Sequence, residues 1–126
     1  MKIALTGASG LVGRFVLRGL ASRGHEVVAL GRRPVDGAEW RGWRLGGRAT
    51  FDGCDALVHA AFSHLPGRYR GGEGDDPEGF LARNRDGSLR LFKEARAAGL
   101  GRIVFLSSRA VYGDYPPGTE LAEDFL

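Results

Sequence analysis

The sequence predicts an α/β domain built on a doubly wound parallel sheet. Apolar runs typical of buried strands alternate with amphipathic helical segments along the chain. A glycine-rich turn joins the first apolar run to the first helix, and strand, helix and strand at this short spacing favour parallel pairing. The 126 residues are enough for one domain with a core of its own.

The first third of the chain supplies two strands and a helix. Residues Lys2 to Thr6 predict a buried strand, and Leu11 to Arg23 predict a helix that ends at Gly24. Glu26 to Leu30 predict a second strand, followed by a turn through Pro34. The helix is expected to bury one stripe of apolar side chains, namely Val12, Phe15, Val16 and Leu20.

The middle of the chain is ambiguous. Trp43 to Leu45 could form a short strand, but too few residues remain before Asp55 for a crossover helix, so we expect Trp40 to Phe51 to be irregular. Asp55 to Ala60 predict the next strand. The glycine-rich segment from Ser63 to Asp75 predicts an exposed loop.

A long helix and a last strand complete the pattern. Asp76 is suited to cap the helix, Pro77 to open it, and Gly99 to end it after Ala98. Arg102 to Ser107 predict a buried strand. The helix should bury Phe80, Leu81, Asn84, Leu91, Ala95 and Ala98 on one stripe.

The turn Thr6-Gly7-Ala8-Ser9-Gly10-Leu11-Val12-Gly13 carries the strongest functional signal. Gly7 would allow the tight turn, Gly10 a close approach of the backbone to a pyrophosphate, and Gly13 close packing of helix and strand. The helix that follows would direct its free N–H groups at the phosphates. A nucleotide-hydrolysing P-loop is disfavoured because Arg14 and Phe15 stand where Lys and Ser or Thr are required. The cofactor contacts predicted in this turn are Gly7, Ser9, Gly10, Leu11, Val12 and Gly13.

Cofactor choice should be decided at the end of the second strand. Sites for NAD place an acidic residue there to bind the adenosine ribose, whereas this chain has Gly31. Arg32 and Arg33 follow directly and suit a 2′-phosphate, so NADP is favoured over NAD, with Arg14 a weaker candidate. The alternative is that both are ordinary exposed arginines of a basic chain.

Composition disfavours several other classes of protein. The net charge is +3, but the arginines are scattered, so a nucleic-acid partner is not expected. Cys54 is the single cysteine and the histidines have no zinc spacing, so we expect no metal site and a reducing, cytoplasmic location. No apolar run approaches the roughly 18 residues that cross a bilayer.

Three blocks together resemble the extended short-chain dehydrogenase/reductases, the NAD-dependent epimerase/dehydratase family. They are the glycine turn, Asp55-Ala56-Leu57-Val58-His59-Ala60-Ala61, which is similar to the family's D-x-V-x-H-x-A, and Ser107-Ser108-Arg109-Ala110-Val111-Tyr112-Gly113, which is similar to its S-S/T-x-x-V-Y-G. The resemblance implies a Rossmann-like fold with strand order 3-2-1-4-5 and a dinucleotide bound across the carboxyl ends of the strands.

The resemblance also assigns roles to single residues. It implies that Ala60, Ala61 and Phe62 line the dinucleotide, that Ser108 matches the catalytic Ser or Thr, and that Ser107 lies beside the nicotinamide. From the residues alone, serines at the end of a strand could equally cap backbone groups.

Two polar residues have competing interpretations. His59 is interpreted as a hydrogen-bonded structural histidine and not as an acid or base. The segment beginning at Asn84 is similar to the family's N-V-x-G-T, which implies an amide near the cofactor, and the alternative is an amide that bridges backbone groups. The family also forms dimers through this helix, so a homodimer is expected.

The catalytic pair of the family is absent from these 126 residues. Relatives use a tyrosine with a lysine four residues later, but the fourth residues after Tyr69, Tyr112 and Tyr115 are Glu73, Pro116 and Thr119. We therefore expect residues 1–126 to be the N-terminal part of an oxidoreductase or epimerase, without its substrate-binding part and inactive alone. The parent would act by hydride transfer on a nucleotide sugar or related carbonyl substrate. The alternative is a non-catalytic NAD(P)-sensing regulator of the same fold.

Overall fold

The computed structural model describes residues 1–68 and 71–124, with every side chain among them except that of Arg109. Within these residues the chain forms a five-stranded parallel sheet in the order β3-β2-β1-β4-β5, which confirms the predicted fold class and strand order. The strands are β1 (Lys2–Thr6), β2 (Glu26–Gly31), β3 (Glu39–Gly42), β4 (Ala56–His59) and β5 (Arg102–Phe105).

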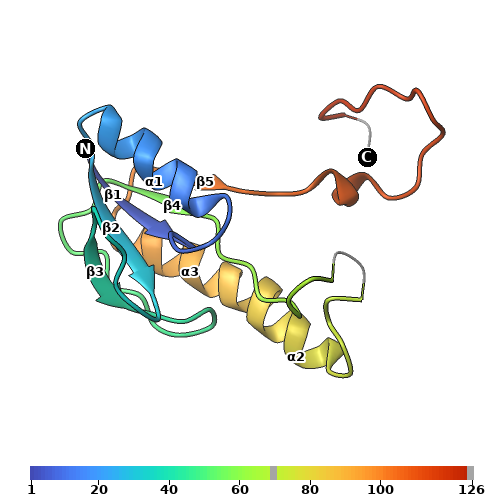
Figure 1. The fold of residues 1–126 in the computed structure, drawn as a ribbon, viewed down its shortest axis with the longest axis horizontal. Coiled ribbons are helices and arrows are strands. Elements are labelled where there is room, and N and C mark those ends of the chain that lie inside the picture. The colour runs from blue at the N-terminus through green and yellow to red at the C-terminus, as the bar shows by residue number, and fades with distance from the viewer. Residues whose placement is uncertain (69–70, 125–126) are drawn as a thin grey trace.

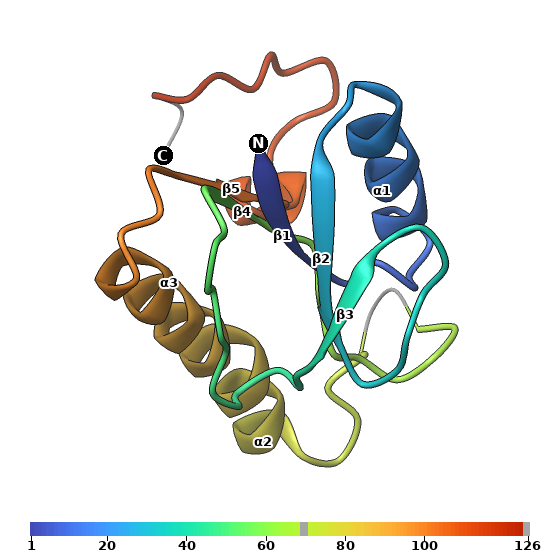
Figure 2. The same cartoon turned by 90° about the vertical axis from the view of Figure 1, so that its left-hand side faces the viewer.

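Helices cover both faces of this sheet (Figures 1 and 2). One face packs against α1 (Gly13–Ser22), and the other against α3 (Gly87–Ala97), while α2 (Pro77–Leu81) begins the same helical segment and extends beyond the sheet. Because neighbouring residues of a strand point to opposite faces, Ala4 lies in the core under α3 and Leu5 in the core under α1. The sheet is therefore doubly wound.

Helix α1 buries only part of the predicted stripe, since Val16 and Leu20 face the core but Val12 and Phe15 do not. Its core-facing residues are Gly13, Val16, Leu17 and Leu20. They follow the spacing i, i+3, i+4, i+7 from Gly13. Val12 and Phe15 are exposed instead, because the helix begins at Gly13 and not at Leu11, and because Gly13 is the residue that is pressed against the turn.

Strand β3 overlaps the segment from Trp40 to Phe51 for which the sequence predicted no regular structure. It pairs in parallel with β2, from Val28 opposite Glu39 to Gly31 opposite Gly42. Three of its four residues are exposed, so the alternation of apolar and polar residues that marks a half-buried strand is missing. The segment after it is irregular, as predicted, and places the buried Trp43 in the core under α3.

Strand β5 ends at Phe105 and is exposed along its whole length, so the prediction of a buried strand was wrong. Ile103, Val104 and Phe105 suggested burial by their apolar character. Within the described residues, however, β5 lies at the edge of the sheet and pairs only with β4.

The long helical segment begins and ends as predicted. Asp76 accepts a hydrogen bond from the Gly79 N–H at 3.0 Å, and Gly99 follows the helix with φ of 80°. Between α2 and α3 the π-helical turn η1 (Ala82–Asp86) was not predicted. A π turn adds a residue to the helical repeat and changes which side chains face the sheet. Leu81, which precedes this turn, is exposed, and so is Ala98, which caps the end of α3. The residues buried in α3 are Gly87, Ser88, Leu91 and Ala95.

Candidate functional site

The carboxyl ends of the strands meet at one edge of the sheet, where the strand order reverses. From β1 the chain proceeds to β2 and β3 on one side and then returns to β4 and β5 on the other. Thr6, at the end of β1, lies opposite both Leu30 and His59 in the pairing register. The gap between the loops that follow β1 and β4 is the position where open α/β sheets bind ligands.

The glycine turn closes onto this position with no space for side chains. Gly7 has φ of 74°, and a Cβ atom on it would lie 2.7 Å from the Ala60 carbonyl carbon. A Cβ on Gly13 would collide with the Gly7 carbonyl oxygen, while one on Gly10 would lie 3.2 Å from that oxygen. Two of the three glycines are therefore required by close contact, as the motif predicts.

The start of α1 leaves positive charge available to a ligand. Val12 caps the helix without a side-chain hydrogen bond, and no acidic residue occupies the first turn. Among the described residues, the N–H groups of Ser9, Leu11 and Val12 have no backbone or side-chain acceptor. The compact glycine cradle and these unpaired donors fit the diphosphate of a dinucleotide.

Thr6 attaches the loop after β4 to the end of β1. Its Oγ1 atom accepts hydrogen bonds from the N–H groups of Ala60 and Ala61, both at 3.1 Å. Ala60 and Ala61, which sequence predicted as cofactor-lining residues, are thereby fixed beside Gly7. Thr6 itself was missed, although a hydroxyl residue at the end of a strand, just before a glycine turn, is a recognisable signal.

His59 lies beneath this loop and is fully buried. Its Nδ1 atom is 2.6 Å from Thr6 Oγ1, and its Nε2 atom is 2.8 Å from Ser88 Oγ on α3. Because Thr6 Oγ1 already accepts two N–H groups, its single proton is donated to Nδ1, which assigns the Nε2–H tautomer. Burial lowers the pKa of His59 to about 4. The histidine is a hydrogen-bonded structural residue, as interpreted from sequence.

Asn84 fixes the next part of the same loop. Its Oδ1 atom accepts the Ser63 N–H at 2.8 Å, and its Nδ2 atom donates to the carbonyl oxygens of Ser63 and Phe80 at 2.7 and 3.1 Å. The structure therefore shows that the Asn84 amide bridges backbone groups, which is one of the two interpretations that the sequence left open. Phe62, between these anchors, is exposed and packs edge-on against Phe80.

Ser107 and Ser108 follow β5 and are both exposed. Ser108 caps the 3₁₀ turn η2 (Arg109–Tyr112), since its Oγ accepts the Ala110 N–H at 3.2 Å. Ser108 therefore caps a backbone group, which is the alternative role considered from sequence. Because its Oγ only accepts in this bond, the Ser108 hydroxyl proton remains available for donation.

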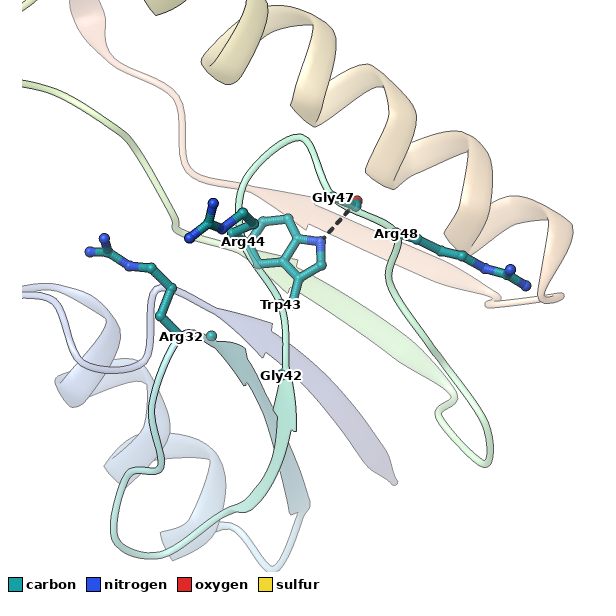
Figure 3. Close-up of a pocket in the computed structure, with 7 residues that line it drawn as sticks. Arg32, Gly42, Trp43, Arg44, Gly47 and Arg48 are labelled. Carbon is teal, nitrogen blue, oxygen red and sulfur yellow. Dashed lines mark hydrogen bonds between the residues drawn. The ribbon is translucent and has the colours of Figure 1, made fainter.

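A cavity of about 420 Å³ opens at the carboxyl end of β2 (Figure 3). Arg32 lies on it, but Arg33 is not among its lining residues. Arg44 and Arg48 were missed, because they lie in the segment that sequence left irregular. Their signal was two further arginines, one within and one shortly after the possible short strand of Trp43 to Leu45. The full lining is Gly31, Arg32, Gly42, Trp43, Arg44, Gly47 and Arg48.

In the described parts of the chain, no three His, Cys, Asp or Glu side chains converge on a point that could hold a metal ion. None of the helices within residues 1–68 and 71–124 has the length and apolar character to span a bilayer.

The doubly wound sheet and the glycine cradle at its switch point define a Rossmann-like nucleotide-binding domain. The family model described as "NAD dependent epimerase/dehydratase family" matches residues 3–125. The chain belongs to this family.

Characterised relatives agree with this assignment. The chain is 36% identical to a UDP-glucose 4-epimerase of Klebsiella pneumoniae, covering 92% of this chain and 95% of that protein. It is 34% identical to a UDP-glucose 4-epimerase of Streptomyces lividans, covering 90% of this chain and 37% of that protein.

Solved structures give the same fold. A short-chain dehydrogenase/reductase superfamily protein from Agrobacterium tumefaciens with bound NAD has a TM-score of 0.83 and 30% identity, covering all of this chain and 38% of that one. MoeE5 in complex with UDP-glucose and NAD has a TM-score of 0.79 and 30% identity, covering 98% and 41%. The chain thus spans less than half the length of the Streptomyces protein and of both solved chains.

Proposed function

We propose that residues 1–126 bind a nicotinamide dinucleotide as part of an oxidoreductase or epimerase that acts by hydride transfer. The observation that carries the proposal is a turn that combines the close-packed Gly7, Gly10 and Gly13 with the unpaired N–H groups of Ser9, Leu11 and Val12 at the start of α1. The family match and the NAD-bound relatives support a domain of this type. The described residues fit the cofactor, because the N–H groups of Ser9, Leu11 and Val12 have no acceptor among these residues and can donate to a diphosphate.

Different residues around the switch point would bind different parts of the dinucleotide. Ser9, Leu11 and Val12 would donate N–H groups to the diphosphate, and Ala60 and Ala61 would line the dinucleotide with Phe62. Asn84 would act indirectly, by holding the loop that carries Phe62. The nicotinamide ring, when bound, supplies hydride transfer.

Ser107 and Ser108 would lie at the reacting end of the cofactor. The Ser108 hydroxyl, oriented by its cap on Ala110, would donate a hydrogen bond to the oxygen of the reacting carbon. The proton-transferring tyrosine and its lysine would come from a longer parent chain, together with the substrate-binding part. The parent's substrate would be a nucleotide sugar or a related carbonyl compound, a class consistent with the UDP-glucose epimerase relatives.

Within this proposal NADP(H) is the favoured cofactor. Support comes from Gly31, which stands where an acidic residue would bind the ribose hydroxyls of NAD, and from Arg32 beside the cavity. The two solved relatives described above contain NAD. The preference for NADP(H) is therefore proposed from this chain's own residues and not from those relatives. A reducing, cytoplasmic location is part of the same proposal, since Cys54 is the single cysteine.

A homodimer through the segment from α2 to α3 also belongs to the proposal. Leu81 and Leu89 are both about half exposed, at 46% and 51%. Sedimentation equilibrium should give a dimer that Leu89→Glu converts to monomer, and a monomeric wild-type chain would contradict it.

A non-catalytic dinucleotide sensor is the second candidate. The observation that favours it is that no tyrosine in these 126 residues is followed by lysine at the fourth position. Sequencing the gene of origin distinguishes the two: a Tyr-x-x-x-Lys pair after Leu126 supports the enzyme, and a gene without the pair supports the sensor. Residues 1–126 alone should show dinucleotide binding without turnover, so turnover with NADPH and a carbonyl substrate would contradict both candidates.

A further inference from the structure

Helix α3 holds the segment after β3 through two charged side chains. The Glu94 carboxylate accepts the Ala49 N–H at 3.0 Å through its Oε2 atom. The Arg90 guanidinium donates from Nη1 to the Gly46 carbonyl oxygen at 3.2 Å, and from Nε to Glu94 Oε1 at 3.0 Å. Glu94 therefore holds Ala49 directly, and it orients the arginine that holds Gly46.

The residues between these two attachment points line the cavity at the end of β2. Gly47 and Arg48 form part of its wall (Figure 3). Their neighbours on either side, Gly46 and Ala49, are the residues that α3 holds. None of the described residues that line the cavity belongs to α3. Side chains of a helix outside the cavity thus determine where this part of its wall lies.

The backbone of this segment lies directly against α3. A Cβ atom on Gly87 would lie 2.7 Å from the Gly46 nitrogen, so the two backbones touch at the first turn of α3. Ala49 is buried in the same apolar cluster as Leu91 and Ala95 of the helix. Apolar packing is non-directional, whereas hydrogen bonds have a preferred geometry. The bonds of Glu94 and Arg90 therefore fix the position of a segment that packing only brings close.

The other end of the segment is attached to β2. The Trp43 N–H donates to the Gly31 carbonyl oxygen at 3.0 Å, and the Trp43 indole N–H donates to the Gly47 carbonyl oxygen at 3.2 Å. Gly31 is the last residue of β2 and lines the cavity. The segment thus bridges β2 and α3, and the shape of the cavity depends on both attachments.

This cavity lies where the adenosine end of a dinucleotide would bind. Leu30 pairs with Thr6, so the cavity begins one strand, about 5 Å, from the glycine turn. In doubly wound sheets the diphosphate lies on that turn and the adenosine ribose lies at the end of the second strand. A displaced wall at Gly47 and Arg48 would therefore weaken nucleotide binding while the glycine turn stays intact.

We propose that Glu94 is a positioning residue for the adenosine end of the dinucleotide site. The inference rests on the proposed dinucleotide function and deepens it. Glu94 acts through Ala49 and Arg90, which keep Gly47 and Arg48 in place as the wall of the cavity. Nucleotide affinity therefore depends on a side chain of α3 that is not part of the cavity lining.

The first test measures NADH affinity by isothermal titration calorimetry. Glu94→Ala should weaken NADH binding by about threefold to tenfold, since the segment loses its attachments to α3. Glu94→Gln keeps an oxygen that can accept the Ala49 N–H and should stay within about twofold of wild type. Arg90→Ala removes the Gly46 attachment alone and should weaken binding by about twofold to fivefold.

Leu100→Ala is the matched control for a purely structural effect. Leu100 packs against the same core cluster, but it lies next to the amino end of β5, at the sheet edge opposite the cavity. This variant should lower the midpoint of urea denaturation at least as much as Glu94→Ala does. It should nevertheless leave NADH affinity within about twofold of wild type.

Hydrogen exchange at the Gly47 amide provides a second measurement. The Gly47 N–H donates to the Arg44 carbonyl oxygen, so no substitution at Glu94 removes its acceptor. Exchange at Gly47 should be faster in Glu94→Ala than in Glu94→Gln or Leu100→Ala, because only Glu94→Ala releases the segment from α3.

Failure of this inference can be told apart from failure of the proposed function. If folded Glu94→Ala bound NADH as tightly as wild type, Glu94 would not position the site, although dinucleotide binding itself would stand. Equal losses of affinity in Glu94→Ala and Leu100→Ala would also overturn the inference, since general destabilisation would account for both. If the wild-type chain bound neither NADH nor NADPH, the proposed function would fail and the inference with it. Circular dichroism checks that each variant is folded.

Discussion

The Thr6 hydroxyl oxygen lies 2.6 Å from His59 Nδ1, which joins the ends of the two central strands by a buried side-chain hydrogen bond. The two residues are directly opposite each other in the parallel pairing of β1 and β4. Thr6 Oγ1 also receives the N–H groups of Ala60 and Ala61. A single hydroxyl therefore sets the shape of the crevice in which we place the dinucleotide.

Replacing Thr6 by valine should open this crevice. Valine keeps the volume but leaves two N–H groups and one ring nitrogen without their partner, at a cost of about 2–4 kcal/mol in the free energy of unfolding. Thr6→Ser is the matched control and should stay within about 1 kcal/mol of wild type. Urea denaturation measures both, and equal stabilities of the two variants would contradict the role of the hydroxyl.

The stability of the chain should fall in mild acid because of His59. Burial holds the pKa of His59 at about 4 in the folded state, against about 6.5 in the unfolded chain, so the unfolded state binds the proton first. The stabilisation is complete above about pH 6.5 and is lost as the pH falls towards 4. Between pH 7.5 and 5 the loss should be about 2 kcal/mol.

This pH dependence can be isolated by comparing two variants. His59→Gln should show a flatter stability profile between pH 7.5 and 5 than the wild type, whatever its absolute stability. His64→Gln removes an exposed histidine and should keep the wild-type slope. A wild-type slope in His59→Gln would show that another group titrates.

Alanine at Gly13 should destabilise the glycine turn, whereas alanine at Gly19 should not. A Cβ on Gly13 would collide with the Gly7 carbonyl, and the backbone cannot move without displacing α1 from the sheet. We expect a loss of about 2–4 kcal/mol and of dinucleotide affinity. In the same helix, a Cβ on Gly19 meets only the flexible end of Arg23 at 3.6 Å and should stabilise by about 0.5–1 kcal/mol. Thermal unfolding measures the stability of Gly13→Ala and Gly19→Ala. Equal changes in stability in the two variants would contradict the packing argument.

Asn84→Asp should loosen the loop after β4. The carboxylate cannot donate to the Ser63 and Phe80 carbonyl oxygens, and it repels them. Faster hydrogen exchange is expected at Phe62 and Ser63, with a loss of about 1–3 kcal/mol in dinucleotide binding. Unchanged hydrogen exchange at the Phe62 and Ser63 amides would show that Asn84 does not position the loop.

The sequence predicted those parts of the fold whose signal is local. The glycine turn, the strands β1, β2 and β4, and the Asp76 cap were predicted within a few residues, because a turn, an apolar run and a cap are each written in consecutive residues. The strand order was predicted through the family resemblance and is confirmed.

The parts that failed depend on contacts between distant segments. β3 has an exposed, polar sequence and exists as a strand because β2 offers it a partner. Leu91 and Ala95 of α3 are buried as predicted, but Leu81 is exposed on the other side of the π-helical turn η1, which changes the helical repeat and has no simple sequence signal. Arg44 could not be assigned to the cavity from sequence, because its position depends on the Trp43 contacts with Gly31 and Gly47.

Dinucleotide binding to residues 1–126 tests the central claim most directly. Titration of the chain with NADPH and NADH, followed by calorimetry, should give saturable 1:1 binding with NADPH the tighter ligand. Binding should disappear when Gly10 is replaced by a bulky residue such as valine, because the backbone could no longer approach the diphosphate. If a folded wild-type chain bound neither dinucleotide, or if folded Gly10→Val bound both as well as wild type, the glycine turn would not be the cofactor cradle.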